Sequence, residues 1–390
     1  AELQTREIDP DELATIVYTS GTTGRAKGVM LSHRNILWNA LACVNLIDIF
    51  PDDLMLSFLP LSHTLERTLG YYLPILTGCR VAFARSVPQL AEDLLQIRPS
   101  ILISVPRIFE RVYGRIQEKL AHEPAIARGL FNKAVEIGWR RFEYQQKRGA
   151  WSPSLLLWPL LQMLVARKVQ ARLGGRIRFA VSGGAALSPD IAKLFIGLGI
   201  RIQQGYGLTE TSPVITANAL DANRPASVGV PLTGVEVKIG EDDELLTRSP
   251  SVMLGYWNNP EATAAAIDRR GWFHTGDMAT CDEDGFFSIA GRAKDMFISG
   301  GVNVYPAEIE NVLLQHPSLG DAAVVGVPHG TWGEVGVAFV VPARGEKVEA
   351  PYTLSDMADD SAGLLDALGY ASGWSLTSRG RSGMRMSPRW

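Results

Sequence analysis

Short apolar runs alternate with polar or glycine-rich turns and with stretches of helical spacing from Leu13 to Gly207. The runs are rich in β-branched and aromatic residues, which favour strands. We expect strands at 15–20, 80–84, 101–105 and 176–181 and a helix at 33–47. This alternation predicts a layered α/β domain.

A long helical section is predicted after Pro106, because apolar residues recur there at every fourth position. They are Ile108, Val112, Ile116 and Leu120. We expect this section to continue, with breaks, to Arg172. It includes the apolar run 155–166, which is too short to span a bilayer and contains Pro159.

Basic residues flank this apolar run on both sides. They are Arg140, Arg141, Lys147 and Arg148 before it and Arg167, Lys168 and Arg172 after it. A buried helix with solvated ends is the commoner explanation for such a pattern. A helix lying on a membrane and collecting fatty acids is the alternative.

The pattern of apolar and turn-forming residues changes twice further along the chain. After about Asn223, alternating segments with Gly, Pro and Asp predict a small antiparallel β region. After Arg292, a helix near Pro306 and two strands around a turn predict a small α+β unit. We therefore expect a large domain at 1–291, a partial C-terminal domain at 292–349 and a poorly ordered tail at 350–390.

Charge and cysteine content limit the class of protein. The chain has 41 acidic and 38 basic residues and a formal net charge of -3, so no global field draws it to nucleic acid. Its three cysteines fit neither a disulfide framework nor a zinc site. No signal-peptide pattern opens the sequence, and we expect a cytoplasmic location, with peripheral contact to the inner membrane face left open.

The most informative stretch is "YTSGTTGRAKGVMLSH", residues 18–33. Glycines there can turn successive backbone amides toward an anion, while hydroxyl groups and Lys27 add further donors and a positive charge. The Walker spacing is absent, which disfavours an ordinary P-loop ATPase. Composition alone leaves a phosphate-binding loop and a polar surface turn about equal.

This string resembles the phosphate-loop signature of the adenylate-forming superfamily, which includes acyl-CoA synthetases, luciferases and adenylation domains of peptide synthetases. Further motifs similar to that family's landmarks follow in order. They are "VSGGAALS" (181–188), "QQGYGLTETSP" (203–213), "GWFHTGDMA" (271–279), "GRAKDMFISGG" (291–301) and "NVYPAEIE" (303–310). Two more, "LPLSHTLER" (59–67) and "SVPRIFERVYGRI" (104–116), look most like long-chain fatty acyl-CoA synthetases. The segment "SGGVNVYPAEIE" is also similar to medium-chain and aryl-CoA ligases.

The resemblance implies two half-reactions with ATP, Mg²⁺ and coenzyme A. A carboxylate attacks the α-phosphate of ATP, giving acyl-adenylate and pyrophosphate, and the CoA thiol then displaces AMP. The first step brings two anions together, so it demands charge neutralisation rather than a protein nucleophile. We therefore expect a ligase of the long-chain fatty acid–CoA type whose substrates are the acid, ATP and CoA.

The resemblance also assigns roles to individual residues. Lys27, Thr209, Glu210, Arg292 and Lys294 are the implied catalytic residues, Glu210 is the Mg²⁺ ligand and Lys294 is the pivot between two domain orientations. The implied nucleotide-binding residues are Thr19, Ser20, Gly21, Thr22, Thr23, Gly24, Lys27, Gly183, Gly184, Ala185, Gly205, Tyr206, Gly207, Thr209, Asp277 and Arg292. The implied acyl or CoA contacts are His63, Gly183, Gly207, Gly300 and Gly301.

The sequence departs from the family pattern near its end. The family's closing glycine-lysine motif is absent, and Lys347 is the one lysine after Lys294. Much of the family's N-terminal portion is also missing, and the tail's loss of resemblance is typical of a frameshift or a truncated gene. We expect poor adenylation with retained binding of ATP or acyl-AMP. A non-catalytic nucleotide-binding fragment and a medium-chain or aryl acid–CoA ligase are the alternatives.

Overall fold

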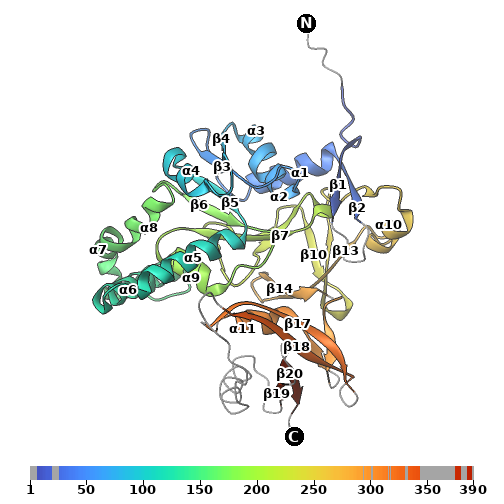
Figure 1. Ribbon diagram of the computed structural model, residues 1–390. Helices are drawn as coiled ribbons and strands as arrows, with labels where there is room; N and C mark the ends of the chain where they lie inside the picture. Colours follow the sequence, from blue (N-terminus) through green and yellow to red (C-terminus); the bar gives the residue numbers. More distant parts are fainter. Residues whose placement is uncertain are drawn as a thin grey trace. The chain divides into compact units, whose positions relative to one another are not determined.

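The computed structural model describes residues 7–19, 26–292, 294–299, 302–314, 316, 318–329, 333–342, 374–378 and 384–388 (Figure 1). The chain divides into two compact units. The first unit comprises Ala1–Ile239, Leu246–Thr275 and Cys281–Ser288, and the second comprises Gly240–Leu245, Gly276–Thr280 and Ile289–Trp390. The last of these boundaries lies close to the domain boundary that the sequence predicts at 291.

A seven-stranded sheet, in the order β4-β3-β5-β6-β7-β8-β9, forms the centre of the first unit. Its strands are β4 (Arg80–Phe83), β3 (Leu54–Ser57), β5 (Ile101–Ser104), β6 (Phe179–Ser182), β7 (Ile202–Gly207), β8 (Val214–Ala217) and β9 (Val230–Pro231). The first five are parallel and the last two pair antiparallel. All four residues of β5 and of β6 are buried, as expected for parallel strands covered on both faces. The predicted α/β class is confirmed.

Helices cover both faces of this sheet (Figure 1). The connections from β4 to β5, β5 to β6 and β6 to β7 run in one direction across the sheet and the connection from β3 to β4 runs in the other. Right-handed crossovers therefore place α4 (Leu90–Ile97), α5 (Pro106–Ala121) and α9 (Pro189–Gly197) on one face and α2 (Thr64–Arg67), η1 (Thr68–Tyr72) and α3 (Leu73–Thr77) on the opposite face. The main apolar core lies on the face that α4, α5 and α9 cover.

The long helical section predicted between 106 and 172 is confirmed, with breaks. It consists of α5, α6 (Ala125–Gln145), η2 (Pro153–Leu157), α7 (Trp158–Leu161), η3 (Gln162–Ala166) and α8 (Arg167–Arg172). Helix α9 begins at Pro189. Ser188 occupies its N-cap position, but its side chain makes no capping hydrogen bond.

A hairpin precedes the first helix. Strands β1 (Leu13–Thr19) and β2 (Lys27–Ser32) pair antiparallel, and β12 (Gly255–Tyr256) extends the sheet on the other side of β2. Helix α1 (His33–Val44) follows at once, and its first turn is closed by a capping box in which the Ser32 and Asn35 side chains each bond the other's backbone amide. The predicted strand at 15–20 and helix at 33–47 are thereby confirmed.

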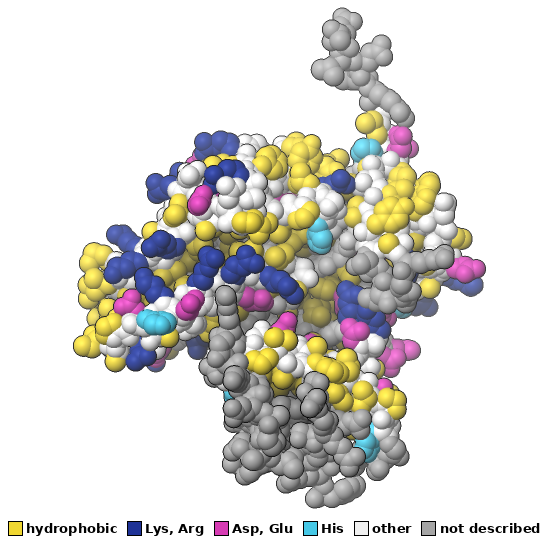
Figure 2. All heavy atoms as spheres, in the orientation of Figure 1, with side chains coloured by type: hydrophobic (Ala, Val, Ile, Leu, Met, Phe, Trp, Pro, Cys, Tyr) yellow, Lys and Arg dark blue, Asp and Glu magenta, His cyan; other side chains and the backbone are white. Residues whose placement is uncertain are grey.

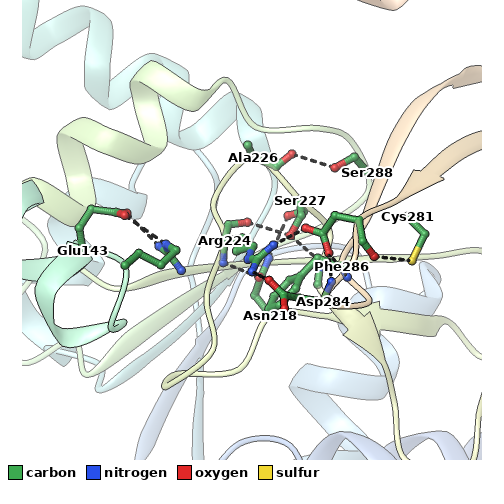
Figure 3. A network of polar contacts seen from close by, with 12 residues as sticks. Glu143, Asn218, Arg224, Ala226, Ser227, Cys281, Asp284, Phe286 and Ser288 are labelled. Carbon is green, nitrogen blue, oxygen red and sulfur yellow. Dashed lines mark hydrogen bonds and ion pairs between the residues drawn. The ribbon is translucent and has the colours of Figure 1, made fainter.

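The predicted small β region forms the sheet β10-β11-β13-β14. Its strands are β10 (Glu236–Ile239), β11 (Glu244–Arg248), β13 (Phe273–Cys281) and β14 (Phe287–Arg292), with η5 (Glu241–Asp243) before β11 and α10 (Pro260–Ala266) before β13. The turn between β13 and β14 is held by Arg224, which pairs with both Asp282 and Asp284 (Figure 3). The Arg224 guanidinium also lies 4.2 Å from the ring centroid of Phe286, so one fork-shaped cation fixes this turn to the loop after β8.

The second unit contains a six-stranded sheet in which β15 and β20 flank β18 and β17 also pairs with β18. Its elements are β15 (Phe297–Ser299), β16 (Val302–Val304), α11 (Pro306–Leu313), β17 (Leu319–His329), β18 (Gly333–Pro342), β19 (Trp374–Ser378) and β20 (Met384–Pro388). Phe297, Ile309, Val324 and Ala338 form its core. The predicted α+β pattern is present. The two last strands lie in the tail, where the sequence predicts no sustained element, and the rest of the tail lies outside the described residues.

Candidate active site

The hairpin places the two ends of the glycine-rich loop opposite each other. Thr19 and Lys27 are register partners, and the Thr19 hydroxyl donates to the Lys27 carbonyl over 3.5 Å. The predicted loop residues between them, Ser20 to Gly24, lie outside the described residues. The strands therefore fix where the loop starts and where Lys27 emerges.

Lys27 lies close to the ring of Tyr256, whose hydroxyl in turn contacts Glu210. Its ammonium nitrogen lies 4.8 Å from the ring centroid of Tyr256, a cation–π arrangement. The Tyr256 hydroxyl donates a hydrogen bond of 2.9 Å to Glu210 Oε1. Burial, with the neighbouring Glu210 charge adding to it, raises the pKa of Tyr256 well above its ordinary value, which keeps the phenol protonated as the donor. Lys27 and Glu210, which the sequence predicted, thus both contact Tyr256, which it did not.

Helix α1 holds the loops that carry Glu210 and Tyr256. The Asn39 side chain donates to the carbonyl of Val214 over 2.7 Å and accepts from the Val214 amide over 3.1 Å. One turn earlier, Asn35 donates to the carbonyls of Pro250 and Val252 over 2.8 and 2.9 Å. Both asparagines are buried, so these bonds are shielded from water. Helix α1 therefore fixes Glu210 and Tyr256 relative to the Lys27 strand.

The surroundings of Glu210 fit a magnesium ion bound through phosphates. Its Oε2 has no hydrogen bond to a described residue, and its backbone carbonyl accepts from Met253 over 2.8 Å, which fixes its position. Among the described residues no group of three or more His, Cys, Asp or Glu side chains gathers to cage a metal. Mg²⁺ commonly uses one or two carboxylates plus phosphates and water, and when bound it would neutralise charge on the phosphates.

Two predicted glycines, Gly183 and Gly184, shape the turn after β6. Gly184 has a φ of +83°, in the region where glycine is favoured. A side chain at Gly183 would lie 3.1 Å from Leu65, which belongs to α2. The amide of Leu187 donates to the Gln204 side chain over 2.9 Å and so ties the turn to β7. Ala185 is exposed at its tip.

The predicted residues Gly205, Tyr206 and Gly207 end strand β7, and Thr209 begins the short helix η4 (Thr209–Thr211) that carries Glu210. A Cβ atom at Gly207 would lie 1.9 Å from the Pro213 carbonyl oxygen, so only glycine lets the chain turn back so tightly. Tyr206 is half-buried and in register with Thr216. These residues lie at the carboxyl end of β7, the edge where open α/β sheets bind ligands.

His63 has a structural role that the sequence analysis did not assign. It occupies the N-cap of α2, and its Nδ1 accepts from the Leu65 amide over 3.3 Å. The ring is exposed, and Leu65 in turn faces Gly183. A place for His63 as a wall of the acyl site remains a prediction.

Two predicted ribose ligands meet in the second unit. Arg292 Nε lies 3.2 Å from Asp277 Oδ1, and the Asp277 side chain is buried while that of Arg292 is half exposed. Lys294 lies 3.9 Å from Asp295. Gly300 and Gly301 lie outside the described residues. The ion pair orients the Asp277 carboxylate, which can still accept hydrogen bonds from hydroxyl groups.

Comparison with known proteins identifies the class to which this fold and site belong. Residues 1–257 match the AMP-binding enzyme family, and residues 308–363 match the C-terminal domain of AMP-binding enzymes. The chain therefore belongs to the AMP-binding enzyme family, as the sequence motifs predict.

Relatives of known type give a finer comparison. The long-chain-fatty-acid–CoA ligase FadD15 of Mycobacterium tuberculosis is 37% identical over 327 residues, which are 82% of this chain and 53% of the relative. A feruloyl-CoA synthase of Amycolatopsis is 33% identical over 362 residues, which are 88% of this chain and 62% of the relative. The chain thus spans little more than half the length of these curated relatives.

Solved structures share the fold. ATP-bound MatB from Rhodopseudomonas palustris has a TM-score of 0.71 at 29% identity, covering 92% of this chain and 63% of that protein. MenE from Bacillus subtilis, in complex with ATP and magnesium ion, has a TM-score of 0.68 at 25% identity, covering 92% of this chain and 66% of that protein. No helix among the described residues is long and apolar enough to cross a membrane.

Replacing Tyr256 by phenylalanine is expected to raise the Mg²⁺ concentration needed for half-maximal ATP binding about tenfold, because Glu210 loses the donor that orients it. The ring under Lys27 remains, so folding and cation–π contact are kept. The measurement is a titration of ATP binding at varied Mg²⁺. An unchanged Mg²⁺ requirement would show that the phenol does not position Glu210.

Proposed function

We propose that this chain activates a fatty acid as acyl-adenylate with ATP and transfers the acyl group to coenzyme A. The convergence of Lys27, Tyr256 and Glu210 inside the family's motifs is the observation that carries the proposal. Lys27 would neutralise phosphate charge and Glu210 would hold Mg²⁺, which together supply the charge neutralisation that attack of a carboxylate on a phosphate requires.

We propose a long acyl chain as the substrate, and an apolar cavity in the first unit that would hold a few of its methylene groups supports this proposal. A cavity of about 80 Å³ lies on the face of the sheet covered by α4, α5 and α9. Its apolar walls include Leu94, Leu102, Phe109, Ala180 and Phe195. Such walls suit methylene groups, whose burial stabilises by about 0.8 kcal/mol each.

The position of this cavity relative to the glycine turn follows from strand alternation. Leu102 and Ala180 line the cavity, and the residues two places further along β5 and β6 are Ser104 and Ser182. Residues two apart on a strand project to the same face, so the cavity lies below the carboxyl ends of both strands. Gly183 follows Ser182 directly. An acid bound with its carboxylate at the Gly183 turn would direct its chain toward this cavity.

A panel of acids of different chain length tests this assignment. The expected result for the wild-type chain is AMP release that depends on CoA and favours palmitate over butyrate. The variant Ala180→Leu narrows the cavity and is expected to lower the palmitate-to-butyrate rate ratio about tenfold, since contacts of several methylene groups are lost. Under this proposal butyrate ends before the cavity, so its rate serves as the internal control for folding. An unchanged ratio would contradict the assignment.

A second function, binding of nucleotide or acyl-adenylate without efficient turnover, is favoured by one observation. The sequence lacks the family's closing glycine-lysine motif. If this candidate holds, acyl-AMP binds but AMP release in the same panel stays at the rate without enzyme. Preference for aromatic acids in the panel would instead support an aryl acid–CoA ligase, the type of reaction for which the Amycolatopsis relative is named.

A further inference from the structure

A set of exposed apolar side chains lies along η2, α7 and η3, separate from the exposed apolar side chains of α1 and α3. We call Leu156, Leu157, Leu160, Met163 and Leu164 the apolar ridge. Leu156 is 72% exposed, Leu160 51% and Met163 54%. Their spacing places them on one side of the helical section, while Trp158, Leu161 and Ala166 on the other side are buried in the main core.

The ridge explains why the sequence alone did not decide between a buried and a surface helix. The helical section is apolar on both sides, and only one side is covered by protein. Monomeric soluble proteins rarely expose contiguous apolar patches of this kind, and such patches mark interaction sites. Trp151, which is 56% exposed, lies just before the section and adds an aromatic ring of the type that favours the membrane–water interface.

The charged residues that flank the ridge in the sequence are all basic. From Tyr144 to Pro189 the sequence has seven Lys and Arg residues and no Asp or Glu. Arg167, Lys168 and Arg172 directly follow the ridge and are exposed. Within the described part of the chain, none of these three forms an ion pair. In Figure 2 apolar side chains gather at the tip that carries α7 in Figure 1, with Lys and Arg on the adjoining surface.

We propose that the apolar ridge inserts into the surface of an anionic lipid bilayer. An exposed apolar face followed by unpaired cations is the arrangement by which a helix lies in a membrane interface, and the cations select anionic headgroups. A water-soluble anionic partner would bind the cations but leave the ridge exposed to water. An anionic bilayer would bind the cations and also bury the ridge.

Membrane binding by the apolar ridge would also affect how the substrate reaches the enzyme, an inference that rests on the proposed function. Long-chain acids partition into bilayers. Helix α5 lines the apolar cavity, and α5 and the ridge both belong to the long helical region between residues 106 and 172. An enzyme resting on the membrane by this section would take its substrate from the lipid phase rather than from water.

Flotation of the full chain with lipid vesicles tests the proposal, without ATP, acid or CoA. The chain is expected to float with vesicles that contain phosphatidylglycerol and to bind those of phosphatidylcholine alone at least tenfold more weakly, with the difference shrinking at high salt. The double variant Leu160→Glu/Met163→Glu is expected to lose vesicle binding about tenfold or more. The pair Arg167→Gln/Lys168→Gln is expected to lose the preference for the anionic lipid.

Ile75→Glu is the matched control, because Ile75 is 65% exposed on α3, away from the ridge. It is expected to float like the wild type. Circular dichroism of each variant separates misfolding from lost binding. The proposal is overturned if the wild type does not float, or if the ridge variant floats like Ile75→Glu. It is also overturned if light scattering shows that the wild type is a dimer, and the ridge variant is a monomer with unchanged vesicle binding. Butyrate activation without vesicles reports on the proposed function independently.

Discussion

Replacing Lys27 by methionine is expected to slow formation of acyl-adenylate about a hundredfold, the scale of loss when one preorganised electrostatic group is removed from a reaction centre. Lys27 emerges from β2 beside Tyr256, so its charge is positioned before substrate arrives. Methionine keeps most of the side-chain length and the apolar contact with the ring. The measurement is the single-turnover rate of acyl-AMP appearance at saturating ATP.

Lys193→Met is the matched control, because Lys193 is an exposed residue of α9. Its adenylation rate is expected to equal that of the wild type. Equal rates for the two methionine variants would show that Lys27 does not act on the phosphates, whatever the absolute rate of the chain.

The largest expected effect on stability comes from Glu66. This residue of α2 is fully buried, and neither carboxylate oxygen has a hydrogen-bond partner of good geometry among the described residues. Burial raises the pKa of Glu66 to about 7, opposed by the nearby Ser57 hydroxyl. A Cβ atom at Gly70, one turn further along, would lie 2.5 Å from Glu66 Oε1, so glycine at that position makes space for the carboxyl group.

The direction of the pH dependence follows from this raised pKa. The unfolded chain releases the Glu66 proton near its ordinary pKa of 4.5, whereas the folded chain keeps it to about pH 7. The stability that the protonated carboxyl contributes is therefore fully present below pH 4.5 and is lost as the pH rises through 7. Glutamine cannot ionise, so Glu66→Gln does not undergo this loss.

We expect the free energy of unfolding of Glu66→Gln, relative to wild type, to rise by about 3 kcal/mol between acid and mildly alkaline pH. Urea unfolding at a series of pH values measures this difference. Glu110→Gln, at an exposed position of α5, is the control and is expected to show no such trend. A constant difference for Glu66→Gln across the series would mean that folding does not raise the pKa of Glu66.

The motifs predicted Lys27, Glu210, Asp277 and Arg292 because each stands at a fixed place in a local string of residues. They did not predict Tyr256, which meets Glu210 across 46 positions of sequence. They also did not predict Asn39, whose bonds to Val214 join residues 175 positions apart. Contacts between residues so far apart in the sequence depend on how strands and helices pack, and local sequence periodicity does not predict them.

The burial of certain polar residues was also not predicted from the sequence. Glu66 stands next to Arg67 in "LPLSHTLER" and looks like a solvated charge in the sequence, yet it is fully buried. Asn35 and Asn39 are spaced one helical turn apart, a signal that could have marked them as a polar stripe on the buried side of α1. By contrast, the strands β5 and β6 were predictable because both faces are buried and their sequences are apolar up to a final serine.

Calorimetric titration with Mg²⁺ and ATP tests the central claim most directly, because it measures nucleotide binding without depending on turnover. The account predicts saturable binding of about one nucleotide per chain, weakened at least tenfold in Lys27→Met and in Glu210→Gln but not in Lys193→Met, a difference of about 1.4 kcal/mol or more. Absence of saturable binding by the folded wild type, or equal affinity in all four proteins, would contradict the assignment of Lys27 and Glu210 to a nucleotide site.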